Sequence, residues 1–189
     1  MNPCAKFFIL VGPSGVGKST LIKQLAEHKI SFAPLITHTT RTIRPGEIHT
    51  QDYFFISNEE YLEKKANNEF MFPVSHYGNH YGICKKYINE KLTTGNHLIG
   101  SLTGNVAKQM ISFVGDNVIT IFIAPPSFES LQERLSQRKT ETETSMQIRL
   151  SCAQKELQEQ YDFDHHIIND DLDQTTKKLI DILKKESLR

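Results

Sequence analysis

A short glycine-rich segment near the start of the chain constrains the fold more than any other feature. Gly12–Ser19 reads GPSGVGKS and matches the pattern GxxxxGK[ST]. It follows the continuous apolar run Lys6–Val11, which predicts a strand buried on both faces. An amphipathic helix is predicted to begin at Lys18. The order of strand, glycine-rich turn and helix is the context in which this pattern holds phosphate.

The residue types of this segment suit a chain of phosphates. Glycines let the backbone wrap closely, so that several N–H groups point at one phosphate, and the following helix adds the positive end of its dipole. Lys18 would supply a cation for the outer phosphates, and the Ser19 hydroxyl could be a ligand for Mg²⁺. Hydrolysis, switching and phosphoryl transfer all stay open as reactions. The residues expected to bind a nucleoside triphosphate here are Gly12, Pro13, Ser14, Gly15, Val16, Gly17, Lys18, Ser19 and Thr20.

The rest of the chain alternates predicted strands and helices, which indicates an α/β fold with a mostly parallel sheet. Residues 35–57 and 70–83 differ, because they are rich in threonine, arginine, aromatic residues and turns, and they predict an inserted lobe of short antiparallel strands. The polar segment 139–145 predicts a mobile loop. The other strands are expected at 97–102, 118–124 and 166–168, and the helices at 57–66, 85–92, 106–113, 127–137, 145–162 and 172–185.

Composition excludes several classes of protein. The 189 residues fit one domain, and 22 basic residues balance 22 acidic ones, so a broad surface for nucleic acid or acidic membranes is not expected. Cys4, Cys84 and Cys152 are far apart and have no metal-ligand spacing, which predicts reduced thiols. No apolar run approaches the roughly 20 residues of a membrane span, and no export signal is evident. We therefore expect a cytoplasmic protein.

A second group of candidate residues lies between 38 and 53. Arg41 and Arg44 are three residues apart beside several hydroxyl groups, and Tyr53 and Tyr81 add phenols. Paired arginines suit a phosphate monoester, because the guanidinium group is permanently charged and binds two oxygens at once. A solvated loop of scattered charge would show the same residues, so the pattern alone leaves both interpretations open.

Several stretches together resemble the guanylate kinase family. They are GPSGVGKST after the first strand, TTRTIRPGE followed by DYFF, and then YGNHYG. The segment PPSFESLQERLSQR, the helix that contains Arg149, and Ile168–Asp171 match as well, so the resemblance covers nearly the whole chain. It implies a P-loop NTPase fold of three α/β/α layers. The implied parts are a core at 1–34, 84–125 and 153–189, an acceptor-binding lobe at 35–83 and a lid at 126–152.

The resemblance also implies roles for single residues in a transfer from ATP to a nucleoside monophosphate, most simply GMP, with Mg²⁺ on the donor phosphates. Lys18, Arg138 and Arg149 would stabilise the transferring group, with Arg41 as a fourth catalytic residue. Asn169 would bind ATP, whereas Arg134 is as well explained as a helix-surface charge. ATP and the acceptor would be the partners of a monomer or small homo-oligomer. The residues implied to hold the acceptor phosphate are Thr37, Arg41, Arg44, Glu47, Tyr53 and Tyr81.

The positions that read guanine in the family are altered in this chain. Phe72 stands where the family has an acid, Ile83 where it has Thr or Ser, and Ile99 and Ser101 replace two acids. A guanine edge facing Phe72 and Ile83 would leave polar groups unpaired, which costs roughly 1–3 kcal/mol per group. Two alternatives therefore stay open. One is a kinase for another phosphorylated small molecule, such as ribose 1,5-bisphosphate, and the other is a non-catalytic binding module.

Overall fold

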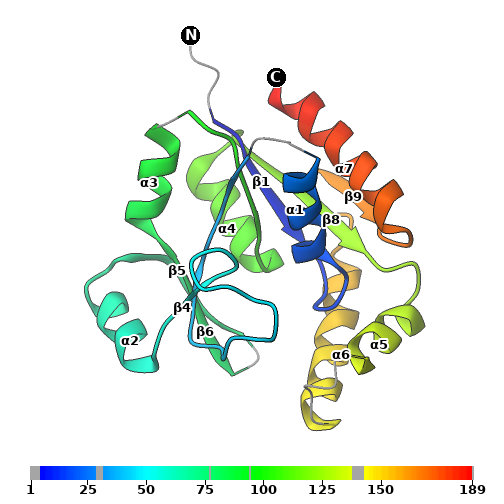
Figure 1. Ribbon diagram of the computed structural model, residues 1–189, viewed down its shortest axis with the longest axis horizontal. Helices are drawn as coiled ribbons and strands as arrows, with labels where there is room; N and C mark the ends of the chain where they lie inside the picture. Colours follow the sequence, from blue (N-terminus) through cyan, green and yellow to red (C-terminus); the bar gives the residue numbers. More distant parts are fainter. Residues whose placement is uncertain (1–4, 29–31, 77, 94, 138–142, 189) are drawn as a thin grey trace.

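The computed structural model describes residues 5–28, 32–76, 78–93, 95–137 and 143–188, and its centre is a parallel five-stranded sheet (Figure 1). The strand order is β2-β7-β1-β8-β9, and every neighbouring pair is parallel. The predicted α/β class is therefore confirmed. The strands are β1 (Phe7–Val11), β2 (Ala33–Pro34), β7 (Leu98–Ser101), β8 (Val118–Ala124) and β9 (His165–Ile168).

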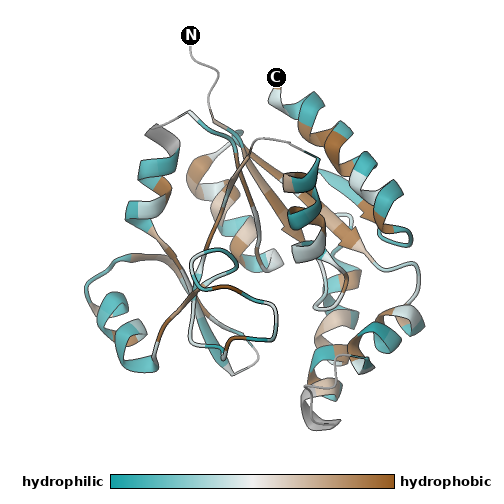
Figure 2. Ribbon diagram, viewed as in Figure 1, coloured by the Kyte–Doolittle hydropathy of each residue, from teal (hydrophilic) through white to brown (hydrophobic). Residues whose placement is uncertain are grey.

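Helices cover both faces of this sheet, which gives three layers. Alternate residues of β1 point to opposite sides: Phe7 and Ile9 join the core under α4, whereas Phe8 and Leu10 join the core under α1 and α7. Figure 2 shows the strands as the most apolar part of the ribbon. The helices packed here are α1 (Lys18–Glu27), α3 (Lys85–Thr93), α4 (Gly104–Val114), α5 (Phe128–Ser136), α6 (Glu143–Gln158) and α7 (Leu172–Ser187).

A second, smaller sheet lies beside the main one and has the order β4-β3-β6-β5. Its β5–β6 and β3–β6 pairs are antiparallel, as the sequence predicts. The β3–β4 pair is parallel, so the expectation of antiparallel strands throughout is wrong for this pair. The segment 40–53 connects the end of β3 to the start of β4 across the sheet, so the two strands run in the same direction. The elements are β3 (His38–Thr39), β4 (Phe54–Phe55), α2 (Asn58–Ala66), β5 (Phe70–His76) and β6 (Asn79–Cys84).

Most predicted boundaries agree with the structure, and two need correction. Helix α6 begins at Glu143, so the predicted loop 139–145 is wrong for its last three residues. The rest of that loop and Arg138 lie outside the described residues. Helix α6 also ends at Gln158, before the predicted Asp162, where turns replace helical hydrogen bonds.

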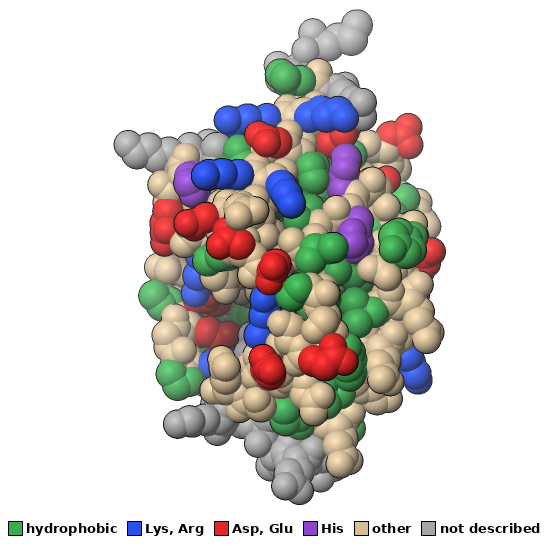
Figure 3. Space-filling model, turned by 90° about the vertical axis from the view of Figure 1, so that its right-hand side faces the viewer, with side chains coloured by type: hydrophobic (Ala, Val, Ile, Leu, Met, Phe, Trp, Pro, Cys, Tyr) green, Lys and Arg blue, Asp and Glu red, His purple; other side chains and the backbone are tan. Residues whose placement is uncertain are grey.

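The surface carries charges of both signs. On the face shown in Figure 3, acidic and basic side chains are interspersed rather than gathered by sign. This arrangement agrees with the balance of 22 basic and 22 acidic residues. Among the described residues, no helix is long and apolar enough to cross a membrane.

We predict that His38 makes the second sheet sensitive to acid. His38 is 9% exposed, and its ring stacks on Phe54 at 4.6 Å. Burial, assisted by the charge of Lys64, lowers the pKa of His38 to about 4. Between about pH 6.5 and 4, His38 therefore binds a proton in the unfolded state but not in the folded state. The free energy of unfolding keeps its full value above about pH 6.5 and decreases as the pH falls toward 4.

The loss should be at most about 3 kcal/mol, since one pKa unit corresponds to about 1.4 kcal/mol. Urea unfolding at several pH values between 4 and 7 measures it. His38→Phe, which cannot take up a proton, should flatten this part of the pH profile. His28→Gln at the exposed end of α1 is the control and should keep the slope of the unchanged protein. Equal slopes for the protein and His38→Phe would contradict the prediction.

Candidate active site

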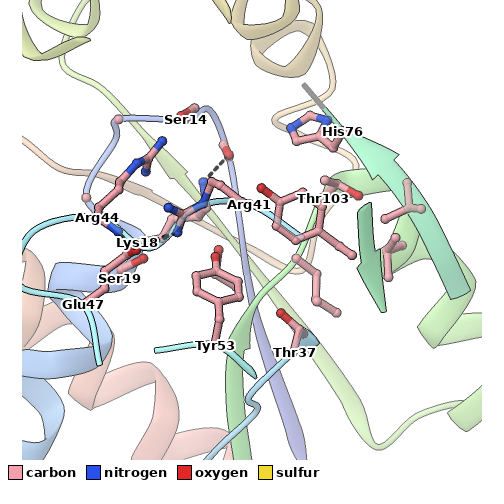
Figure 4. Close-up of a pocket in the computed structure, with 18 of the residues that line it drawn as sticks. Ser14, Lys18, Ser19, Thr37, Arg41, Arg44, Glu47, Tyr53, His76 and Thr103 are labelled. Atoms are coloured by element: carbon pink, nitrogen blue, oxygen red, sulfur yellow. Dashed lines mark hydrogen bonds and ion pairs between the residues drawn. The ribbon is translucent and has the colours of Figure 1, made fainter. Parts of the chain in front are cut away.

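One large cavity opens at the carboxyl ends of β1 and β7, and its volume is about 580 Å³ (Figure 4). The glycine-rich loop, the second sheet, the start of α4 and one face of α6 all contribute to its lining. The carboxyl end of a parallel sheet is where ligands bind in open α/β proteins. The cavity therefore lies where the sequence places its phosphate-binding motif.

The glycine-rich loop runs from β1 to α1 and is packed tightly against β8. Gly12 has φ +133°, and a Cβ there would lie 2.2 Å from the carbonyl oxygen of Ile123. Only glycine fits this approach. The Lys18 ammonium donates hydrogen bonds to the carbonyl oxygens of Gly12 and Pro13, the latter at 2.9 Å. The cation thus lies across the hollow that the loop forms.

The motif residues divide into those that line the cavity and those that support the loop. Pro13 and Val16 are buried and do not belong to the lining. Asn169 is 5% exposed, and its side-chain amide donates to the Val16 carbonyl oxygen at 2.7 Å. Arg134 donates to the Asn169 carbonyl oxygen at 2.9 Å, so it is more than a surface charge. The motif residues in the lining are Gly12, Ser14, Gly15, Gly17, Lys18, Ser19 and Thr20.

Glu47 organises the arginines on the opposite side of the cavity. Its two carboxylate oxygens accept from Arg41 Nη2 at 2.7 and 3.0 Å, and one of them also accepts from the Arg44 backbone N–H at 2.9 Å. The Arg41 guanidinium lies 5.3 Å from the centre of the Tyr53 ring. Burial alone would lower the pKa of Arg41, but the bond to Glu47 raises it above its ordinary value. Arg41 is therefore a fixed, permanently charged group.

The other residues expected to bind the acceptor phosphate reach the same cavity. Tyr53 and Tyr81 lie with their ring centres 6.2 Å apart, and burial raises the pKa of Tyr53. Its phenol therefore stays a neutral hydrogen-bond donor. Figure 4 shows Arg41, Arg44, Glu47 and Tyr53 around one hollow, with Thr37 below them. All six predicted residues line the cavity, namely Thr37, Arg41, Arg44, Glu47, Tyr53 and Tyr81.

Helix α6 adds Arg149 and Glu156 on the same helical face. Arg149 donates to the Ser14 hydroxyl oxygen at 2.9 Å. One carboxylate oxygen of Glu156 is buried without a hydrogen-bond partner among the described residues. Burial raises the pKa of Glu156, against the opposing effect of Lys18. The sequence analysis missed Glu156, although its spacing of seven residues from Arg149 places both on one face of the helix.

His76 and Thr103 are two further lining residues that the sequence analysis missed. Burial lowers the pKa of His76, and the charges of Lys18 and Arg149 lower it further. Thr103 precedes α4, but its hydroxyl makes no capping bond and is buried without a partner among the described residues. No sequence pattern marks Thr103, because its role depends on how the loop after β7 enters α4.

The altered positions 72, 83 and 101 also line the cavity, whereas Ile99 is buried in the core on the other face of the sheet. Phe72 has φ +46°, which is strained for a bulky residue, and it lies where the β5–β6 register shifts. A register shift of this kind re-aims a side chain. The strain is consistent with a side chain directed by the sheet into the cavity.

A parallel sheet of this order, with a glycine-rich loop between β1 and a helix and a cationic cavity above it, defines a P-loop nucleotide-binding protein. The guanylate kinase family model matches residues 4–186. The chain is 34% identical over 181 residues to a guanylate kinase of Wolbachia sp. subsp. Brugia malayi, covering 96% of this chain and 93% of that relative.

A guanylate kinase of Rickettsia felis is 37% identical over 178 residues, which is 94% of this chain and 92% of the relative. Among solved structures, the guanylate kinase from Anaplasma phagocytophilum superposes with a TM-score of 0.82 at 26% identity. That match covers 100% of this chain and 89% of the other. The chain therefore belongs to the guanylate kinase family.

We predict that Glu47→Gln loosens both arginines without removing either. The Arg41 and Glu47 side chains are 11% and 18% exposed, so the pair is largely shielded from water. Breaking it by neutralising one partner should lower the free energy of unfolding by about 1–3 kcal/mol. Urea unfolding measures the change. Glu90→Gln, in the exposed pair with Lys86, is the matched control and should change stability by less than about 0.5 kcal/mol. Equal effects of the two variants would contradict the prediction.

Proposed function

We propose that this chain transfers the terminal phosphoryl group of ATP to GMP, forming ADP and GDP. The proposal is supported by one observation above all. The glycine-rich loop and the arginine-tyrosine group held by Glu47 face the same cavity in a chain of the guanylate kinase family. One group suits the phosphates of a donor, and the other suits the phosphate of a monoester acceptor.

The proposed transfer needs positioning and charge rather than a covalent intermediate. Lys18 would exchange its bonds to the Gly12 and Pro13 carbonyls for oxygens of the transferring phosphate. Arg41 and Arg44 would hold the acceptor phosphate opposite, oriented by Glu47. Arg149 already reaches the loop at Ser14 and would add charge from α6. The role of Arg138, and the division into core, lobe and lid, stay predictions.

Mg²⁺ is expected with ATP, and the cavity offers donors that fit it. Mg²⁺ prefers oxygen ligands and usually keeps waters, substrate phosphates and one or two carboxylates around it. Among the described lining residues, Ser19 has a hydroxyl at the start of α1, and Glu156 has a buried carboxylate oxygen without a partner. We propose that these two support the cation, which would neutralise charge on the donor phosphates. Cytoplasmic location and oligomeric state stay predictions.

The first test replaces Arg41 while keeping its charge. Arg41→Lys removes the bidentate hydrogen bonding of the guanidinium group. In a coupled assay of ADP release, kcat/KM for GMP should therefore fall at least a hundredfold. Lys108→Ala is the matched control, because that cation lies outside the cavity lining, in pairs with Glu159 and Asp162. It should leave kcat/KM within about twofold of the original value.

Two results would contradict the proposed function. Unchanged kinetics in a folded Arg41→Lys variant would remove Arg41 from the acceptor site. Turnover of ribose 1,5-bisphosphate, AMP or UMP without any turnover of GMP would show that GMP is not the acceptor. Absence of turnover for all of them, with ATP binding unaffected by Lys18→Ala, would favour a non-catalytic module.

A further inference from the structure

The part of the cavity beyond the arginine-tyrosine group is apolar on one side. We call this side the apolar wall, and it comes from β5, β6, the segment after β7 and the first turn of α4. Figure 4 places His76 and Thr103 on this side, across Arg41 from Ser19 and Glu47. The apolar wall consists of Phe72, Val74, Ile83, Leu102 and Val106.

The apolar wall is fixed in place rather than adjustable. Phe72 combines a positive φ of +46° with a following proline, which restricts the backbone further. Its ring lies 6.0 Å from that of Phe113 on α4. Ile83 is 2% exposed and pairs with Met71 across the β5–β6 ladder. A bound acceptor would therefore contact these apolar side chains directly.

Carboxylates that could pair with an amino group of the acceptor are scarce here. The described lining contains two, Glu47 and Glu156. Glu47 already accepts from Arg41 and from the Arg44 backbone. Glu156 lies on α6, close enough to Lys18 for that charge to act on it, so it belongs to the donor side of the cavity. The neutral polar groups left on this side are the hydroxyls of Thr37, Ser101 and Thr103 and the imidazole of His76.

We propose that this kinase holds the base of its acceptor by contact with the apolar wall and does not read the 2-amino group of guanine. The substrate class is then wider than GMP alone, and inosine 5′-monophosphate (IMP) is accepted at least as well as GMP. IMP is GMP without the 2-amino group. This inference rests on the proposed function and concerns the selectivity of the same site.

The physical basis is the difference between two kinds of selective site. A site built to pair with a polar group of its substrate rejects the analogue that lacks this group by about 10⁴-fold or more, because the buried partner is left unpaired. An apolar surface leaves nothing unpaired when the amino group is missing. The GMP/IMP ratio of kcat/KM should therefore be at most about ten, and values below one fit the same wall, because only GMP buries an unpaired amino group.

The experiment measures that ratio directly. Initial rates of ADP release with saturating MgATP give kcat/KM for GMP and for IMP, and isothermal titration gives the two dissociation constants. A GMP/IMP ratio of at most about ten supports the proposal. A larger GMP preference overturns it and leaves the proposed function standing. If Glu156→Gln then abolishes that preference, the amino group is read from α6.

A gain-of-selectivity variant tests the placement of the apolar wall. Phe72→Glu places a carboxylate in the apolar wall, where it could accept hydrogen bonds from N1–H and the 2-amino group of GMP. The GMP/IMP ratio of kcat/KM should then rise at least tenfold. Tyr161→Glu adds the same charge at an 80% exposed position outside the cavity lining and should leave the ratio unchanged. Thermal melts confirm that each variant is folded, and Ile83→Thr replaces Phe72→Glu if the latter does not fold. An unchanged ratio in the folded wall variant overturns the placement.

The two proposals fail in different ways. If neither GMP nor IMP is phosphorylated, the proposed function fails, but the dissociation constants still test the apolar wall. Equal binding of the two nucleotides would keep the inference. Binding of neither nucleotide would overturn both.

Discussion

Parallel pairing of β1 with β7 on one side and β8 on the other is the constraint on which the rest of the structure depends. It brings the carboxyl ends of the three strands to one edge, where the chain leaves β1 as the glycine-rich loop. The carbonyl oxygen of Ile123 on β8 lies so close to Gly12 that no side chain fits at this position. The phosphate-binding loop is therefore shaped by the sheet as much as by its own glycines.

Charge is distributed to match this geometry. The chain is neutral overall, with 22 basic and 22 acidic residues, yet Lys18, Arg41, Arg44 and Arg149 line a single cavity. Glu47 is one of two acids in the described lining, and it orients Arg41 and the backbone at Arg44. A neutral chain can thus present a strongly cationic site to one small anion and a mixed surface elsewhere.

Sequence patterns predicted the elements that are long and apolar. The predicted bounds of strand β8 are those that it has, because Val118–Ala124 is an apolar run, interrupted at Thr120, between turn signals. Strand β2 was missed, since Ala33–Pro34 is too short for any periodicity and contains a proline. Short strands such as β3 and β4 are defined by their partners, so their parallel pairing could not be read locally.

The same contrast holds for the site. Arg41, Glu47 and Lys18 belong to compact motifs, and the cavity brings them together as expected. His76 and Thr103 reach the cavity through a β-hairpin and a helix entry, which depend on tertiary packing. The division into core, lobe and lid stays a prediction.

The hydrogen bonds of the Lys18 ammonium to the Gly12 and Pro13 carbonyls carry a thermodynamic consequence. Without a nucleotide, the loop satisfies its own cation, so an arriving phosphate must compete with two carbonyl oxygens. Binding is then an exchange of hydrogen bonds rather than a pure gain. Such an internal competitor lowers the affinity of the loop for every nucleotide whose phosphates the Lys18 ammonium contacts.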